Sequence, residues 1–199
     1  MTTAVFRCLL SLLFTLAFSH TAWASSSTHT MQTPDAAVEA ALKKVVDNPS
    51  SFKDKFDAEV WLVDMSGRLA RYVPNPEKRL KLLKLIHEEA TQAGLTPELV
   101  LAVIQVESLF DRFAISSVGA QGLMQVMPFW KKEIGRPNDN LTHIETNLRY
   151  GCTILKHYID EEHGNVMRGL ARYNGSTGKV WYAERVMDAW QNHWYVNNQ

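Results

Sequence analysis

The sequence predicts an all-α fold, a multi-helix domain packed around one central, buried helix. Apolar residues recur at helical spacing along most of the chain, and no alternating strand pattern is longer than a few residues. Residues 99–106 are apolar almost all round, which is typical of a helix in the middle of a domain. The length of 199 residues favours one domain with a sizeable core.

The first helices are predicted from apolar spacing and from the residues that separate them. Residues 35–48 form a helix candidate that ends at Pro49. Residues 56–72 place aromatic and aliphatic side chains at helical spacing, and residues 77–93 repeat this pattern. Gly94 follows as a candidate C-terminal cap.

The central helix has a clear start signal. Thr96 is a candidate N-cap, Pro97 occupies the first helical position and Glu98 lies in the first turn. The apolar residues 99–106 continue this helix, whereas the serines and glycines of residues 113–122 predict a loop.

The last third of the chain is predicted to alternate loops and helices. Short helical turns are expected within residues 124–134, and residues 135–142 form a second loop. The remaining helices are expected at residues 144–162, 166–173 and 179–194.

Residues 1–24 have the three zones of a cleaved secretory signal. Arg7 supplies a positive flank, residues 8–18 are apolar, and Ala22 and Ala24 are small residues at the expected cleavage site. The apolar run is shorter than the roughly 20 residues that cross a bilayer as a helix, so a permanent anchor is the less favoured alternative. Residues 25–34 are then expected to be a flexible leader, followed by an N-terminal helical extension at 35–75 and the main domain at 76–199.

Composition excludes several classes of protein. The 21 basic and 21 acidic residues balance, which argues against a nucleic-acid binder that relies on a basic field. Two cysteines exclude a disulfide-rich miniprotein and a four-cysteine zinc site. Cys152 lies in an apolar helical pattern that favours a buried, inert thiol. His157 and His163 flank the acidic residues 160–162, which we interpret as a solvated helix end and not as a metal site.

Glu107 is the residue with the strongest chemical signal. It follows the apolar residues 99–106, so its carboxyl is expected to lose water, which raises its pKa. A carboxyl that stays protonated near neutral pH is what a general acid requires. The alternative is a structural glutamate that reaches solvent at a helix end.

Several short motifs carry a resemblance to a known family. They are Glu107-Ser108, Ala114 with Ser116, the Gly-Ala-Gln-Gly-Leu-Met-Gln run at 119–125, Asn147 with Gly151, and the Ala-Arg-Tyr-Asn run at 171–174. In order and spacing, these blocks resemble the catalytic domain of lytic transglycosylases of the soluble-lytic type, whose fold is related to goose-type lysozyme. The resemblance covers roughly residues 80–195.

The resemblance implies a role for each motif. Glu107 would be the single catalytic acid/base, with Ser108 orienting or hydrogen-bonding near it and Ser116 in the glycan cleft. The other implied substrate-binding residues are Gly122, Met124, Gln125, Tyr173 and Asn174. For Met124 and Tyr173 taken singly, core packing is the simpler interpretation.

The resemblance also implies a reaction. Glu107 would cleave the bond between N-acetylmuramic acid and N-acetylglucosamine in peptidoglycan strands and leave a 1,6-anhydro sugar, in an exported monomer that needs no metal or cofactor. We expect a periplasmic location, or secretion as second choice, without stable membrane insertion once the signal is removed. A goose-type lysozyme-like hydrolase and a catalytically silent glycan-binding domain are the alternatives.

Two weaker signals have simpler explanations. Trp181, Trp190, Trp194 and Tyr195 are able to stack on sugars, but their helical spacing favours packing. The basic cluster at residues 78–84 is expected to be a solvated helix face.

Overall fold

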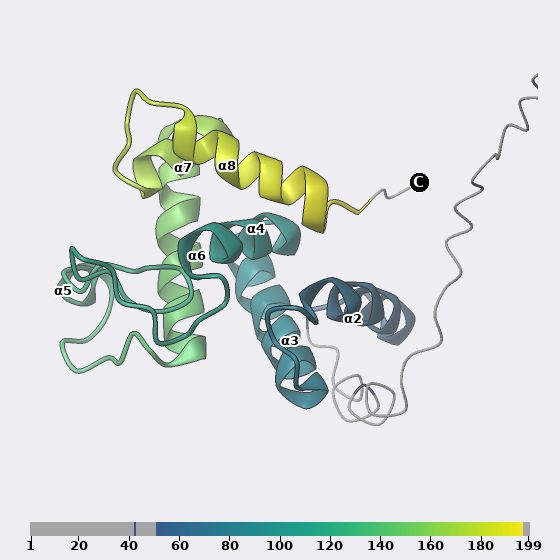
Figure 1. Cartoon of the computed structure of the whole chain (residues 1–199). Helices are drawn as coiled ribbons and strands as arrows, with labels where there is room; N and C mark the ends of the chain where they lie inside the picture. Colours follow the sequence, from purple (N-terminus) through teal and green to yellow (C-terminus); the bar gives the residue numbers. More distant parts are fainter. Residues whose placement is uncertain (1–41, 43–50, 197–199) are drawn as a thin grey trace, which may run out of the picture. The chain divides into compact units, whose positions relative to one another are not determined.

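The computed structural model describes residue 42 and residues 51–196, which are α-helical with connecting loops, as predicted (Figure 1). The described residues belong to one compact unit. The predicted signal at 1–24, the leader at 25–34 and nearly all of the helix predicted at 35–48 lie outside them. Among residues 42 and 51–196, no helix is both long and apolar enough to cross a membrane.

The first two described helices form where the spacing predicted them. Helix α2 spans Lys55–Leu69 and helix α3 spans Pro76–Ala93. Asp54 and Asn75 cap the two N-termini by accepting backbone N–H groups from the first turn. Gly94 ends α3 in the left-handed conformation, with φ of 74°, as predicted.

Helix α4, Pro97–Ser108, is the buried helix that the apolar run predicted. Every residue from 99 to 104 is buried. The helix packs against α3 on one side and against α8 on another (Figure 1). Thr96 occupies the N-cap position, but its side chain makes no capping hydrogen bond, so the start rests on Pro97 and the backbone.

The segment between α4 and α6 is irregular, as expected. Residues 113–122 form a loop in which isolated antiparallel bridges join Gln121 to Ile115 and to Val126. A short helix α5, Trp130–Ile134, follows, and then the predicted loop at 135–142. The remaining α-helices are α6 (Ile144–Glu161), α7 (Val166–Tyr173) and α8 (Trp181–Ala189).

The helix predicted at 179–194 is in fact two elements. Helix α8 ends at Ala189, and Trp190–Trp194 form a π-helix (η1). In η1, Trp194 is fully buried and its indole N–H donates to Gln105 on α4 at 2.8 Å. A π turn contains an extra residue, and here it accompanies the docking of this side chain on α4.

The aromatic residues near this end therefore differ in role. Trp194 is a packing anchor as predicted, whereas the packing prediction is wrong for Trp181 and Tyr195, which are 46% and 48% exposed.

Two charged groups predicted to be solvated are buried instead. Within the basic cluster at 78–84, the Arg79 guanidinium donates to the hydroxyl of Ser66 at 2.8 Å and to two backbone carbonyls of the α2–α3 connection. At the end of α6, Glu162 is buried between Arg168 and Arg172, with N–O distances of 2.6 and 2.7 Å. Both groups bind partners from other segments of the chain, which helical spacing does not reveal. Periodicity alone therefore predicts an exposed environment for two groups that are buried and paired.

Helix α6 packs closely against the loop that precedes α5. Gly151 of α6 contacts Met124, and a Cβ atom added to Gly151 would lie 2.7 Å from the Cβ of Met124. Only glycine permits this approach without displacement of the loop.

We expect Gly151→Ala to destabilise the fold by about 1–3 kcal/mol, because Met124 must move out of a packed core. Gly67→Ala is the matched control: Gly67 lies inside α2 with open space at its Cβ position. That variant should gain about 0.5–1 kcal/mol from the lower entropy of the unfolded chain. Urea unfolding of both variants measures the contrast, and equal effects would contradict the close packing at Gly151.

Candidate active site

Glu107 lies in the last turn of α4, and its half-buried carboxyl meets a side chain from α8. The hydroxyl of Tyr182 donates to Oε1 of Glu107 at 2.6 Å. Burial raises the pKa of Glu107 to about 7, even though the Tyr182 hydrogen bond and the positive charge of Arg185 both lower it. The carboxyl is thus poised to donate or to accept a proton near neutral pH.

Sequence reasoning missed Tyr182, the partner of this carboxyl. The side chain is buried, and its pKa is raised well above the ordinary value, first by burial and then by the charge of Glu107. The available signal was its spacing: Tyr182 and Arg185 are three residues apart and therefore share one face of α8. That spacing does not reveal which element the face meets.

The turn directly after Glu107 is strained. Leu109 and Phe110 have φ values of 51° and 67°, a left-handed conformation that non-glycine residues rarely adopt. Burial of Phe110 holds this turn, because its ring packs against Tyr72 at 5.0 Å and Trp194 at 5.6 Å between centroids. Backbone strain of this kind clusters at functional sites and is sustained by the surrounding packing.

Ser108 connects the end of α4 to the following loop. Its hydroxyl is 2.8 Å from the carbonyl oxygen of Leu123 and 3.2 Å from that of Ile104. Both of these partners are backbone groups, so Ser108 fixes the loop beside Glu107.

Asn147 of α6 holds the loop that contains three of the predicted site residues. Its buried side chain accepts the backbone N–H of Met124 and donates to the carbonyls of Gln121 and Leu141, each at 2.8 Å. Gly122, with φ of 76°, leaves no room for a Cβ atom beside this amide. One buried amide therefore fixes the shape of the loop.

Gln125 and Met124 belong to the same loop. The Gln125 side chain donates to the carbonyls of Ala114 and Gly122 at 3.1 and 2.9 Å, and its own φ is 48°. Met124 is fully buried, and its backbone carbonyl accepts the hydroxyl of Tyr173 at 2.6 Å. Burial and then the charge of Glu107 raise the pKa of Tyr173.

Ser116 and Asn174, the remaining predicted binding residues, lie in a turn and at a helix end. The Ser116 hydroxyl accepts the backbone N–H of Ala120 at 3.0 Å and so shapes its own turn. Asn174 is exposed and directly follows Tyr173, the last residue of α7. Cys152 is buried as predicted, and burial raises the pKa of its thiol.

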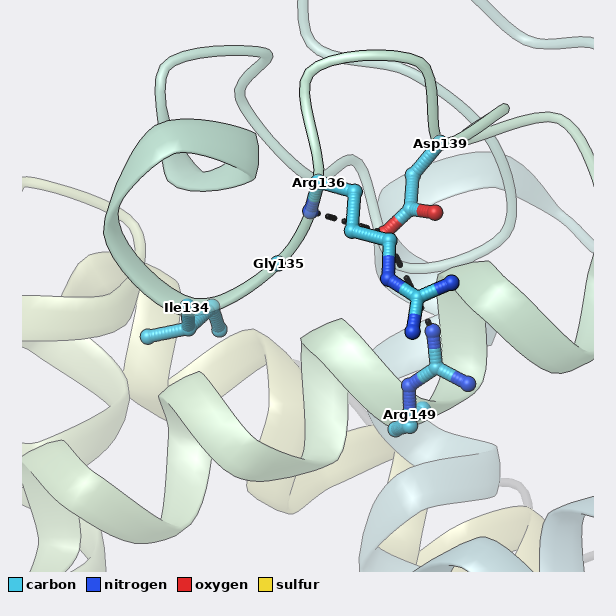
Figure 2. Close-up of a pocket in the computed structure, with 5 residues that line it drawn as sticks. All are labelled: Ile134, Gly135, Arg136, Asp139 and Arg149. Atoms are coloured by element: carbon cyan, nitrogen blue, oxygen red, sulfur yellow. Dashed lines mark hydrogen bonds and ion pairs between the residues drawn. The ribbon is translucent and has the colours of Figure 1, made fainter.

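Two acidic residues that follow Glu107 in sequence, Asp111 and Asp139, have structural partners. Asp111 accepts the backbone N–H of Phe113 within its own turn. Asp139 lines a pocket of about 420 Å³ to which neither Glu107 nor Tyr182 contributes. Figure 2 shows Asp139 there beside Arg149. There it accepts the hydroxyl of Tyr150 at 2.6 Å and lies 4.0 Å from Arg149. These contacts fasten the loop at 135–142 to α6.

In the part of the chain that the structure describes, no three His, Cys, Asp or Glu side chains are grouped so as to hold a metal ion. At the end of α6, His157 instead lies 3.7 Å from Glu161.

The model of one known protein family matches a large part of this chain. The model of the transglycosylase SLT domain matches residues 84–194, more than half of the chain. The chain belongs to the transglycosylase SLT domain family. The match contains Glu107, Tyr182 and every site residue that the resemblance implied, and it confirms that resemblance.

The relatives of this SLT-domain chain have names that agree with the family. The transglycosylase of Enterobacteria phage PRD1 is 34% identical over 101 residues, which cover 51% of this chain and 37% of the phage protein. Membrane-bound lytic murein transglycosylase C of Yersinia pestis (strain Pestoides F) is 32% identical over 126 residues, which cover 54% of this chain and 35% of that protein. The chain thus matches little more than a third of the length of these relatives.

Among solved structures, an inactive mutant of the lytic transglycosylase Slt from Pseudomonas aeruginosa aligns with 81% of this chain and 36% of its own. The sequence identity is 20% and the TM-score is 0.45.

Because burial raises the pKa of Glu107, we expect the stability difference between the wild type and Glu107→Gln to depend on pH. The folded carboxyl has a pKa of about 7 against an ordinary value of 4.5, so unfolding releases a proton between these pH values. Wild-type stability therefore falls as pH rises through this window, whereas glutamine does not ionise. Between about pH 4.5 and about pH 7, the free energy of unfolding of Glu107→Gln should therefore rise relative to that of the wild type, by at most about 3 kcal/mol. Urea unfolding across this range measures the gain, and a constant difference would contradict it.

Proposed function

We propose that this protein is a peptidoglycan lytic transglycosylase. It cleaves the β-1,4 bond between N-acetylmuramic acid and N-acetylglucosamine and leaves a 1,6-anhydro-N-acetylmuramic acid end. Family membership and the names of the relatives support this class of activity. The observation that carries the proposal is the Glu107 carboxyl, which burial and Tyr182 hold at a pKa of about 7.

In the first step, protonated Glu107 donates its proton to the glycosidic oxygen. The bond from this oxygen to C1 of the muramic acid residue breaks, and the N-acetylglucosamine part leaves with a free hydroxyl. The oxygen of the muramic 2-acetamido group stabilises the positive charge at C1. Tyr182 donates to the carboxylate that remains, because its hydroxyl is already 2.6 Å from Oε1.

In the second step, the Glu107 carboxylate acts as a base. It takes the proton from the C6 hydroxyl of the same sugar, and the C6 oxygen bonds to C1 to close the anhydro ring. The carboxyl ends protonated, as it began, so one residue serves both steps. A pKa of about 7 suits this double role, because neither protonation state is strongly disfavoured near neutral pH.

A single catalytic carboxyl is consistent with the structural partners of Asp111 and Asp139. A hydrolytic glycosidase ordinarily uses two carboxyl groups on either side of the bond. Asp111 is hydrogen-bonded within its own turn, and Asp139 is bound by Tyr150. Ring closure by the substrate's own C6 hydroxyl removes the need for a second base.

The predicted binding residues form the wall beside the acid in this proposal. Gly122, Met124 and Gln125 offer a rigid backbone edge that Asn147 and Tyr173 support. Ser116 shapes the same loop, Ser108 ties that loop to α4, and Asn174 is exposed for hydrogen bonds to sugar groups.

The expected setting completes the proposal. An enzyme of this activity acts outside the cytoplasmic membrane, and the three-zone segment at 1–24 supports export to the periplasm or beyond. We expect a monomer that uses neither metal nor cofactor.

Glu107→Gln should abolish release of anhydro-muropeptides from purified sacculi, because an amide cannot donate the proton. Digestion followed by mass spectrometry measures this, and the loss should exceed about 100-fold. Wild-type products that lack the anhydro ring would assign hydrolysis instead of ring closure. Retained activity of Glu107→Gln would remove this residue as the acid.

Tyr182→Phe should move the alkaline limb of the kcat/KM profile to higher pH. The Tyr182 hydrogen bond favours the ionised carboxyl, so its removal raises the pKa of Glu107 above about 7. We also expect about a tenfold loss at the optimum, since the carboxylate formed in the first step is less stabilised. Tyr150→Phe is the control, because that hydroxyl binds Asp139. An unmoved limb in Tyr182→Phe would contradict the role of this bond.

A further inference from the structure

Trp181, the first residue of α8, is a large aromatic side chain that the fold leaves 46% exposed. Its ring meets the ring of Tyr182 edge to face, with centroids 5.9 Å apart and an interplanar angle of 85°. The hydroxyl of Tyr182 reaches Glu107 at 2.6 Å. One aromatic ring thus separates the exposed indole from the carboxyl.

Trp181 lies at the edge of the α8 face that meets Glu107. Successive residues on a helix turn by about 100°, so Trp181 is about 100° from Tyr182, whose buried side chain reaches the carboxyl. Arg185 is three residues from Tyr182 and four from Trp181, and it lies between them on the helix surface. The exposed indole therefore borders the face that Tyr182 uses, but does not itself contact Glu107.

Burial distinguishes Trp181 from tryptophans that serve packing. Trp194 is fully buried and donates its indole N–H to Gln105. Trp61 is partly buried against the core and donates to Glu98 at 2.7 Å. Trp181 instead keeps almost half of its surface in water, and the adjacent Val180 is 60% exposed. Single exposed apolar side chains are normal on a protein surface, but Trp181 is an aromatic in contact with the partner of the Glu107 carboxyl, and aromatic side chains commonly line ligand sites.

We propose that Trp181 is a stacking platform for one pyranose ring of the glycan strand, next to the bond that Glu107 cleaves. The C–H face of a pyranose is apolar and flat, and an aromatic ring held edge to face against Tyr182 offers it a fixed surface. This proposal rests on the proposed function. Trp181 contributes binding and register of the strand, whereas proton transfer stays with Glu107.

Binding without turnover gives the first test. In a Glu107→Gln background, N-acetylglucosamine tetramer is titrated by isothermal calorimetry with and without Trp181→Ala. Loss of the indole should weaken binding about tenfold, which corresponds to about 1.4 kcal/mol. Trp181→Phe should restore most of the affinity. Phe56→Ala is the matched control, since Phe56 is an exposed aromatic on α2 with 72% exposure.

Kinetics on sacculi give the second test. In the otherwise wild-type enzyme, Trp181→Ala should raise KM about tenfold and leave kcat within about threefold, because the lost contact is made in both ground and transition states. The melting temperature should stay within about 2 °C, since the side chain is half exposed. The alkaline limb of the pH profile should not move.

The outcomes separate this proposal from the proposed function. Unchanged affinity and unchanged KM in Trp181→Ala would overturn the platform, as would a loss of kcat that accompanies a lower melting temperature. If the wild type releases no anhydro product while tetramer binding still depends on Trp181, the platform stands and the proposed reaction fails.

Discussion

The hydrogen bond between Tyr182 and the half-buried carboxyl of Glu107 is the contact around which the candidate site is built. It joins the end of α4 to the start of α8 through two residues that are 75 positions apart in sequence. The carboxyl has a pKa of about 7 only because packing removes water from it. Whatever positions these two helices therefore also sets the proton affinity of the candidate acid.

Packing on two sides of α4 keeps its end, and therefore Glu107, in place beside α8. On one side, η1 places Trp194 and His193 against Gln105, two residues before Glu107, while Arg68 of α2 donates to the backbone of η1. On the other side, the strained turn at Leu109 leads to the loop that Asn147 holds. Helix α2 lies outside the matched family region and still contributes to the same core. The site is thus supported by elements at both ends of the described chain.

Sequence reasoning identified the helices and Glu107 for a common physical reason, which is that both are local signals. Helical spacing, Gly94 and the Thr96–Pro97–Glu98 start signal depend on neighbouring residues. A carboxyl at the end of an apolar helix is equally visible in the chain. The motifs at 119–125 and 171–174 placed the loop and α7 within a known family. Tyr182, Arg79 and Glu162 were missed or misassigned because their partners are selected by packing.

The sequence by itself thus determined the all-α class, the central buried helix and the family, because apolar periodicity and short motifs are written in consecutive residues. The tertiary structure alone decided which hydroxyl meets the acid, that the last helix changes to a π turn, and that Trp181 is exposed while Trp194 is buried. Two tryptophans at helical spacing look alike in a sequence. Their environments differ because only one of them faces α4, and this depends on how helices distant in the chain pack together.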